Sequence, residues 1–248
     1  MSTVLDHLLE VRSRRGAGYL ALLDPDRLSL DELETRAGLC AEAGADAILV
    51  GTSMMLSAAR NAAAYDRLRA TVDLPLISFP GDAGQVVSAA DAILFLCMVS
   101  GRNPELLIGQ QVRAAPLLRE YGVEVISTAY MLIESGTLTS TEYMSSTRPM
   151  PRDKSDIAMA HVLAAEYIGM KLAYLETGSG AGESVPEAMI EAVAGYASLP
   201  IVVGGGIRDP ETARRKVEAG AGFVVTGTAV EQDPGRLREL SAAVHLAE

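Results

Sequence analysis

The sequence has no tryptophan, only three phenylalanines and only two cysteines. With 49% hydrophobic residues and so few aromatic side chains, the core must be built mainly from Ala, Val, Leu and Ile. Cys40 and Cys97 fall in a helix-like and a strand-like run and have no metal-ligand spacing. We therefore expect two buried free thiols, which suit a reducing cytoplasm, and neither a disulfide framework nor a zinc site.

Basic residues are also scarce, with 21 Lys and Arg against 32 Asp and Glu, a net charge of −11. This excess of acid argues against binding of nucleic acid, or of an anionic membrane surface, by bulk attraction. An anionic substrate would depend on local cations or on a metal. The longest apolar run, Ala92–Val99, is too short to span a bilayer, and Met1–Arg15 lacks the apolar core of a signal peptide. These features predict a cytoplasmic protein.

Short β-branched runs alternate with helix-like segments along the whole chain. We expect strands at Tyr19–Leu23, Ala47–Val50, Leu76–Phe79, Ala92–Leu96, Glu124–Met131, Lys171–Leu175, Ile201–Ile207 and Phe223–Thr228. Eight strands with intervening helices and no linker predict one domain over residues 1–248, a (β/α)8 TIM barrel. Only twelve residues separate the third strand from the fourth, so the helix between them should be missing or replaced. An open doubly wound sheet is the alternative, but it would not naturally use eight crossovers.

The last two predicted strands both end in glycine. Gly204–Gly206 close the run I-V-V-G-G-G-I, and Gly227 with Thr228 close F-V-V-T-G-T. Backbone without a Cβ lets N–H groups converge on an oxyanion, and this pair of strands builds the phosphate site of many barrels. The alternative is that Gly204–Gly206 form only a tight strand-to-helix turn.

Acidic and hydroxyl side chains end the first two strands. Asp24 follows the first, and Ser53 follows the second. A carboxylate with a hydroxyl and waters is a typical partial shell for Mg²⁺, which leaves positions for a diphosphate. The alternative is that Asp24 caps a turn and Ser53 caps a helix.

The stretch after the sixth strand, Tyr174–Ala181, is the richest in polar groups. Glu176 lies at the strand's end, where burying an acid is costly unless it binds hydroxyls or a cation. Ser179 and Gly180 are placed to direct a hydroxyl and an N–H at a polar ligand. By contrast, the histidines pair with no nucleophile, so no hydrolytic triad is predicted. The segment Leu132–Pro151 shows no clear period and is expected to be a functional or mobile loop.

Taken in order, the motifs D-P-D-R, V-G-T-S, F-P-G, S-G-R-N-P, Y-L-E-T-G-S-G-A, V-G-G-G-I and V-T-G-T-A-V resemble the geranylgeranylglyceryl phosphate synthase family, whose bacterial relatives are heptaprenylglyceryl phosphate synthases. The resemblance covers roughly Leu22 to Glu231 and is closest to the larger of two subgroups. It implies Mg²⁺-dependent transfer of a prenyl chain from its diphosphate to the 3-hydroxyl of sn-glycerol 1-phosphate. Geranylgeranyl is the chain we expect. The resemblance also implies a homo-oligomer, either a dimer or a hexamer.

Several residues match the positions that the family uses. The resemblance implies Asp24 and Ser53 as metal-linked residues and Glu176 and Tyr174 as catalytic residues. Because the chain is acidic overall, we expect local cations near the diphosphate, with Arg102 as the first candidate and Lys154 as the second. The alternative for either is an ordinary solvated surface charge. The acceptor site that the resemblance implies comprises Tyr174, Leu175, Glu176, Thr177, Gly178, Ser179, Gly180, Gly205, Gly206, Gly227 and Thr228. Glu176 would hydrogen-bond the glycerol hydroxyls and either accept the attacking proton or only position the acceptor.

The prenyl tail that the resemblance implies would need an apolar groove, and the implied lipid product would make transient contact with a membrane. Candidates for the groove are Phe79, Leu96, Met98, Tyr130, Met131 and Ile133, all of which could equally be core residues.

Two departures from the family pattern leave the acceptor open. Thr52 replaces an expected glycine, and Arg27 stands where lysine is common. The first could reshape the diphosphate pocket, and a related prenyltransferase uses 3-phosphoglycerate as its acceptor. A sugar-phosphate isomerase or lyase, with Asp24 and Glu176 as its acid/base pair, is a further alternative, as is a phosphate-binding barrel without activity.

Overall fold

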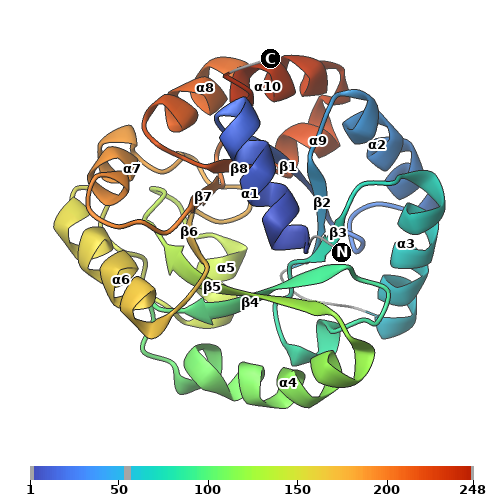
Figure 1. The fold of residues 1–248 in the computed structure, drawn as a ribbon, viewed down its shortest axis with the longest axis horizontal. Coiled ribbons are helices and arrows are strands. Elements are labelled where there is room, and N and C mark those ends of the chain that lie inside the picture. Colours follow the sequence, from blue (N-terminus) through green and yellow to red (C-terminus); the bar gives the residue numbers. More distant parts are fainter. Residues whose placement is uncertain (1–2, 53–56, 247–248) are drawn as a thin grey trace.

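The computed structural model describes residues 3–52 and 57–246. Eight parallel strands form a closed barrel in which each strand pairs with the next and β8 pairs with β1. The strands are β1 (Gly18–Leu23), β2 (Ala47–Val50), β3 (Leu76–Ser78), β4 (Ala92–Met98), β5 (Glu124–Leu132), β6 (Leu172–Glu176), β7 (Ile201–Gly204) and β8 (Phe223–Thr226). Figure 1 shows the strands at the centre and a ring of helices outside them. The predicted (β/α)8 barrel is confirmed.

Helices cover the outside of the barrel and one of its ends. The longer helices are α1 (Val4–Arg15), α2 (Leu30–Glu42), α3 (Ala58–Thr71), α4 (Gln110–Tyr121), α6 (Ser155–Ile168), α7 (Glu187–Ala194), α8 (Pro210–Glu218) and α10 (Leu237–Val244). Ser29 begins α2 with a capping box, in which its hydroxyl accepts from Glu32 N–H and the Glu32 carboxylate accepts in return. In Figure 1, α1 crosses the centre of the ring, and its Leu8 packs into the barrel interior.

Apolar residues form two separate clusters because successive side chains of a strand point to opposite faces. The inner cluster fills the barrel and includes Leu94, Tyr130 and Tyr174. The outer cluster lies between the strands and the helices and includes Met131 and Leu175. Both are largely aliphatic, as the scarcity of aromatic residues predicted.

The connection from β3 to β4 lacks a full helix, as its length predicted. A single 3-10 turn, η1 (Ala83–Gln85), stands in that place. The next connection begins with a π-helical turn, η2 (Glu105–Gly109), which continues into α4. The outer layer of helices is therefore interrupted between β3 and β4. This gap in the helical layer becomes part of the candidate site.

The structure differs from the expectations at several places. The last two strands are shorter than predicted, because β7 ends at Gly204 and β8 ends at Thr226. The segment expected as an irregular loop contains α5 (Ser140–Ser145), a short helix that begins where the Thr139 hydroxyl accepts from Glu142 N–H. A second short helix, α9 (Thr228–Gln232), follows β8 directly. Cys40 is buried as expected, but Cys97 is only half-buried. Among the described residues, no helix combines the length and the apolar character that crossing a bilayer requires.

Candidate active site

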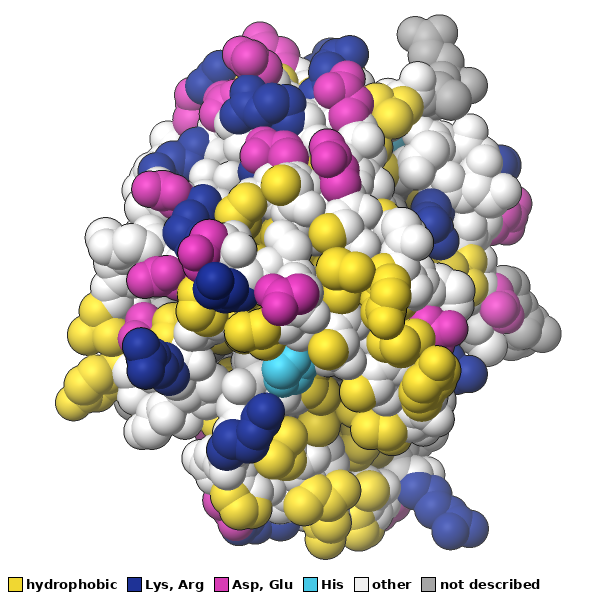
Figure 2. Space-filling view, turned by 90° about the vertical axis from the view of Figure 1, so that its left-hand side faces the viewer, with side chains coloured by type: hydrophobic (Ala, Val, Ile, Leu, Met, Phe, Trp, Pro, Cys, Tyr) yellow, Lys and Arg dark blue, Asp and Glu magenta, His cyan; other side chains and the backbone are white. Residues whose placement is uncertain are grey.

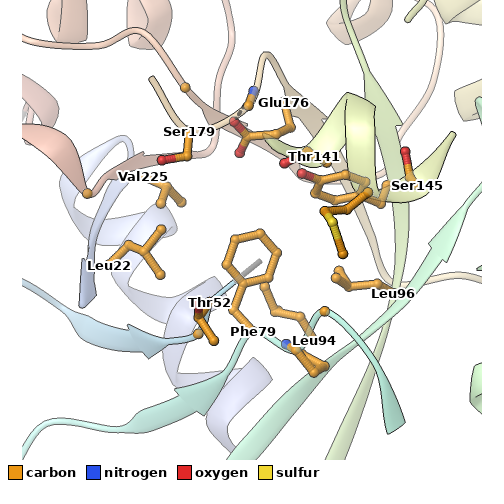
Figure 3. A pocket seen from close by; sticks show the side chains of 18 of the residues that line it. Leu22, Thr52, Phe79, Leu94, Leu96, Thr141, Ser145, Glu176, Ser179 and Val225 are labelled. Atoms are coloured by element: carbon orange, nitrogen blue, oxygen red, sulfur yellow. Dashed lines mark hydrogen bonds between the residues drawn. The ribbon is translucent and has the colours of Figure 1, made fainter. Parts of the chain in front are cut away.

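A cavity of about 450 Å³ opens at the carboxyl ends of the strands. All eight strands deliver residues to it or to the loops that surround it, including Asp24 after β1, Glu176 at the end of β6 and Gly205 after β7. Figure 3 shows Glu176 and Ser179 on one side of this space and Phe79, Leu94 and Leu96 across from them. The cavity thus has a polar half and an apolar half.

Glu176 is the central acid of the polar half. It is the last residue of β6, its exposed fraction is 6%, and one carboxylate oxygen accepts a hydrogen bond of 2.6 Å from Gly178 N–H. Burial raises the pKa of Glu176 to about 7, while that N–H and the nearby Tyr174 hydroxyl act in the opposite direction. A carboxyl group with this pKa can be ionised or protonated near neutral pH, as a general base requires.

Tyr174 lies two residues before Glu176 on the same face of β6. Its hydroxyl is buried and lies beside the Glu176 carboxylate, but among the described residues it forms no hydrogen bond of standard geometry. Its ring packs at 5.4 Å from both Phe79 and Tyr130, parallel to the first and edge-on to the second. An unsatisfied buried hydroxyl beside a cavity is costly unless a ligand or water completes it.

Glycines line the polar half on β7 and on the loop after β6. Gly178, Gly180, Gly205 and Gly206 all have positive φ, between 67° and 94°. A Cβ on Gly206 would lie 2.7 Å from the backbone of Glu183 and Ser184. Only glycine fits this close backbone approach, which leaves the cavity side open to an oxyanion.

Carboxylates and an arginine form a second polar group where β1 meets β8. Arg27 Nε lies 3.4 Å from Asp24 and its Nη1 lies 3.5 Å from Glu231. Burial raises the pKa of both carboxyl groups, against the lowering effect of Arg27 on each. Two half-buried acids that share one arginine would be stabilised by a further cation.

The structure brings most of the predicted site residues together. The cavity lining contains Asp24, Glu176, Gly178, Ser179, Gly180, Gly205, Gly206, Gly227 and Thr228. Tyr174 lies below this lining in the inner cluster. Ser53 lies outside the described residues.

Other predicted residues lie elsewhere. Leu175 belongs to the outer cluster and faces the helices. Thr177 is buried, and its N–H donates to Gly204 C=O. Arg102 is exposed and donates to the backbone carbonyls of Val99 and Gly101, so its guanidinium is not part of the cavity lining. Lys154 is also absent from the lining.

Arg208 and Glu231 are among the lining residues that the predicted site did not include. Arg208 follows the glycines of β7 and donates to Ala181 C=O at 2.6 Å. Glu231 lies in α9 and faces Arg27. The signal for Arg208 was its position immediately after V-G-G-G-I, because a cation next to phosphate glycines is a natural anion ligand. The sequence gives no comparable signal for Glu231.

The apolar half extends from the barrel mouth into the gap beside η1. Phe79, Leu96, Met98 and Tyr130 line it, as the sequence predicted. Met131 and Ile133 do not, because both point outward into the other cluster. Further lining residues are Val86, Ile93, Phe95, Leu106 and Ala114, which come from the η1 turn, the outer face of β4, η2 and α4. The replaced helix thus opens an apolar groove.

Helix α5 covers part of the cavity. Thr141, Met144 and Ser145 line the cavity from this helix, and Figure 3 labels Thr141 and Ser145 among the side chains around this space. The side chain of Thr139 lies against Gly178, where a Cβ would approach it to 2.5 Å. The segment predicted to be a functional loop therefore contributes to both halves of the cavity.

Comparison with known proteins agrees with this geometry. The chain is 40% identical over 244 residues to a protein named geranylgeranylglyceryl phosphate synthase from Chitinophaga pinensis, covering 98% of this chain and 96% of the relative. It is 40% identical to one of the same name from Thermococcus gammatolerans, with 92% of each chain covered.

Solved structures give the same result. The (S)-3-O-geranylgeranylglyceryl phosphate synthase from Thermoplasma acidophilum, solved in complex with sn-glycerol-1-phosphate, superposes with a TM-score of 0.94 at 32% identity and 99% coverage of both chains. An N-acetylmannosamine-6-phosphate 2-epimerase from Clostridium perfringens reaches a TM-score of 0.57 at 12% identity, which shows the barrel fold alone.

The family model known as the PcrB family matches residues 9–244, which leaves only a few residues at either end unmatched. The matched region contains every strand of the barrel and every described residue of the cavity lining. This chain belongs to the PcrB family, together with the geranylgeranylglyceryl phosphate synthases that it resembles in sequence and in fold.

Proposed function

We propose that this chain is a Mg²⁺-dependent prenyltransferase. It moves a polyprenyl group from its diphosphate to the 3-hydroxyl of sn-glycerol 1-phosphate, and geranylgeranyl is the group we expect. The observation that carries the proposal is a single cavity with a glycine-lined polar half around Glu176 and an apolar groove that leaves the barrel beside η1. A small phosphorylated alcohol and a long hydrocarbon chain need these two environments in contact.

The acceptor would lie between β6, β7 and β8. Its phosphate would contact backbone at Gly205, Gly206 and Gly227, with Arg208 on the rim. Glu176 would accept hydrogen bonds from the glycerol hydroxyls. An ionised Glu176 would repel the carboxylate of 3-phosphoglycerate, which favours glycerol phosphate as the acceptor. The complex of the Thermoplasma acidophilum relative with sn-glycerol-1-phosphate supports the same choice.

The donor chain would occupy the apolar groove. Phe79, Leu94, Leu96 and Met98 line its inner part, and Ile93 and Ala114 line the part beyond the barrel wall. Burial of an isoprenoid chain contributes roughly 25 cal/mol for each Å² of apolar surface removed from water. A sugar-phosphate isomerase or lyase would have no use for this groove, so the groove argues against that alternative.

The metal site fits Mg²⁺ in its donor chemistry. Among the described residues no cluster of three or more His, Cys, Asp or Glu is present. Asp24 and Glu231 supply two carboxylates, which is typical for Mg²⁺ because it keeps several waters and takes its other ligands from substrate phosphates. Asp24 and Glu231, with Ser53 as the further ligand that the sequence predicts, would hold the ion, and the ion would neutralise the charge of the departing diphosphate.

Residues of the chain supply the remaining chemistry. Glu176 would take the proton of the 3-hydroxyl as that oxygen attacks the allylic carbon, and its pKa of about 7 suits this role. The rings of Phe79 and Tyr130 line the cavity and Tyr174 packs against both, so aromatic faces would stabilise positive charge on the allylic carbon. The cover of α5 would keep water, a competing nucleophile, away from that carbon.

Assembly and membrane contact complete the proposal. We expect a homo-oligomer, a dimer or a hexamer, and a transient contact with the membrane that receives the lipid product. Leu138, Tyr143 and Met144 support the second point: all three are more than half exposed, and Met144 also lines the cavity, so the apolar path continues from the cavity to the surface.

The test is incubation with labelled geranylgeranyl diphosphate and either sn-glycerol 1-phosphate or 3-phosphoglycerate, with and without Mg²⁺. We expect a label that extracts into organic solvent, as the prenylated phosphate ether, only with glycerol phosphate and Mg²⁺. If the ether forms with 3-phosphoglycerate and not with glycerol phosphate, 3-phosphoglycerate is the acceptor. No transfer to either acceptor would contradict the proposal.

A further inference from the structure

Arg152 connects the two segments that enclose the polar half of the cavity. It lies just after Met150, which pairs with Ile133 in an isolated parallel bridge. Its Nη1 donates to Glu134 C=O at 2.7 Å, and its Nη2 donates to Ser184 C=O at 3.0 Å. The same Nη2 lies 2.9 Å from the Glu183 carboxylate. Arg152 itself does not line the cavity.

The first connected segment is residues 133–152, which we call the arm. The arm begins at the bridge and carries α5, whose Thr141 and Met144 line the cavity. The side chain of Arg152 ties the end of the arm back to its beginning at Glu134, in addition to the backbone bond from Glu134 N–H to Met150 C=O at 2.9 Å.

The second connected segment is residues 177–186, which we call the acceptor loop. Its carbonyl groups are held by cations from three different parts of the chain: Ala181 by Arg208, Ser184 by Arg152 and Val185 by Lys216. A loop that binds an anion must direct N–H groups at the ligand and carbonyl oxygens away from it. Charged donors fix the orientation of these three carbonyl groups, and their hydrogen bonds are about twice as strong as those of neutral donors.

The hydrogen bond from Arg152 to Ser184 C=O holds backbone that lies next to the predicted phosphate position. The backbone of Glu183 and Ser184 packs directly on Gly206, where an added Cβ would lie 2.7 Å away. The arm also packs on this loop, since Ser135 C=O lies close to Gly182 and Thr139 lies against Gly178. Arg152 therefore fixes the loop against Gly206 on one side and the arm against the loop on the other.

We propose that Arg152 is a positioning residue for the acceptor. By binding both segments, it holds the acceptor loop and the arm in a fixed relative position. Gly206, Gly178 and Glu176 then form one site for a small phosphorylated alcohol. This inference rests on the proposed function and goes beyond it. Arg152 touches neither substrate in this arrangement. Its loss should therefore weaken binding of the acceptor and leave binding of the donor in its apolar groove nearly unchanged.

The experiment compares Arg152→Ala and Arg152→Lys with wild type in steady-state transfer. The control is Arg67→Ala, because Arg67 is also paired with carboxylates but lies on α3, away from the cavity. We expect Arg152→Ala to raise KM for glycerol 1-phosphate by about tenfold or more, since it removes two charge-assisted hydrogen bonds. We expect KM for the prenyl donor to change by less than about twofold, within the small effects usual for distant sites.

Two further measurements distinguish a positioning role of Arg152 from a contribution to the stability of the fold alone. Lysine can reach one carbonyl but not two, so Arg152→Lys should recover part of the acceptor KM. Added guanidinium at millimolar concentration should also restore part of the activity of Arg152→Ala. If Arg152→Ala does not fold, Arg152→Lys and Arg152→Gln carry the same comparison.

The outcomes distinguish this inference from the proposed function. If wild type transfers no prenyl group, the proposed function fails. If wild type is active and the variants keep the acceptor KM, even with a lower melting temperature, the role of Arg152 is purely structural and the inference is overturned. Equal increases in both KM values would overturn it as well.

Discussion

The hydroxyl of Tyr174 and the carboxylate of Glu176 lie together above Gly204, the residue that pairs with Glu176 on the neighbouring strand. A Cβ on Gly204 would lie 2.5 Å from the hydroxyl and 2.6 Å from the carboxylate. The glycine on β7 therefore creates the space in which these two side chains meet. Both are buried, and burial of the acid without a compensating ligand is costly.

Replacing Glu176 with glutamine should lower turnover by at least about tenfold, because the amide keeps the shape but cannot accept a proton. Thermal unfolding should show that the fold is intact. Glu10→Gln is the control, since Glu10 is exposed on α1 and lies outside the cavity lining. Unchanged turnover in Glu176→Gln would remove the carboxylate from the mechanism.

The pH dependence of the reaction should reflect the pKa of Glu176. With that pKa at about 7, kcat/KM should rise with pH below about 7 and level off above it, because only the ionised form accepts a proton. The acceptor phosphate also titrates near this range. The comparison is therefore between wild type and Glu176→Gln, and the variant should lose the part of the slope that belongs to the carboxyl group.

The same raised pKa has a consequence for stability. The folded protein holds the proton of Glu176 more tightly than the unfolded chain does, whose pKa is near 4.5. The free energy of unfolding should therefore decrease as pH rises from about 4.5 to about 7, and the loss is complete above that window. Glu176→Gln should be free of this loss, so its melting temperature relative to wild type should be higher at pH 8 than at pH 5. An equal difference at both pH values would contradict the assignment.

The sequence predicts the frame of the barrel because strands of parallel sheets are short apolar runs with clear ends. The run Ala47–Val50 matches β2 at both ends, and Glu176 was correctly placed at the end of β6. The twelve residues before β4 sufficed to predict a replaced helix. Each of these predictions depends only on local composition and on chain length.

The predictions that failed concern the direction and packing of individual segments and side chains. Helix α5 has only six residues and no apolar period, and it is held by Thr139 against Gly178. Leu175 lies inside a recognisable motif, yet it faces the helices because neighbours on a strand alternate between faces. Arg102 and Arg208 both follow strand ends. Arg102 folds back onto the carbonyl groups of its own turn, whereas Arg208 donates to Ala181 C=O on the preceding loop, and only Arg208 lines the cavity.

Removal of Mg²⁺ should abolish transfer. Full activity in excess EDTA would contradict the metal assignment. A sharper test is Asp24→Asn, which should raise the Mg²⁺ concentration for half-maximal activity by at least about tenfold, since it removes a charged ligand. KM for glycerol 1-phosphate should change little, because the proposed acceptor site is formed by β6 to β8. Asp82→Asn is the matched control, as Asp82 also lines the cavity but only caps η1. Equal effects of the two changes would contradict a specific role for Asp24.

Gly206→Ala and Gly122→Ala form a matched pair for the phosphate position. Both glycines have similar positive φ, 67° and 70°, so alanine should strain the backbone by roughly 1–2 kcal/mol at either site. Only Gly206 has backbone 2.7 Å from the added Cβ, and nothing lies within 4 Å at Gly122. Gly122→Ala should lower the melting temperature and leave KM for glycerol 1-phosphate unchanged. Gly206→Ala should lower the melting temperature further and raise that KM, and calorimetric titration with glycerol 1-phosphate checks the second effect directly.

The groove beside η1 should select for donor length through its outer part. Val86 lies on the loop that replaces the missing helix and is only partly buried, so a larger side chain there can narrow the groove without overfilling the core. Val86→Phe should lower kcat/KM for geranylgeranyl diphosphate by about tenfold more than for the shorter geranyl diphosphate, since only the longer chain reaches beyond the barrel wall. Val112→Phe is the control, because Val112 is exposed on α4 and does not line the cavity. If Val86→Phe affects both donors equally, the prenyl chain takes another path, and the gap beside β4 has a different purpose.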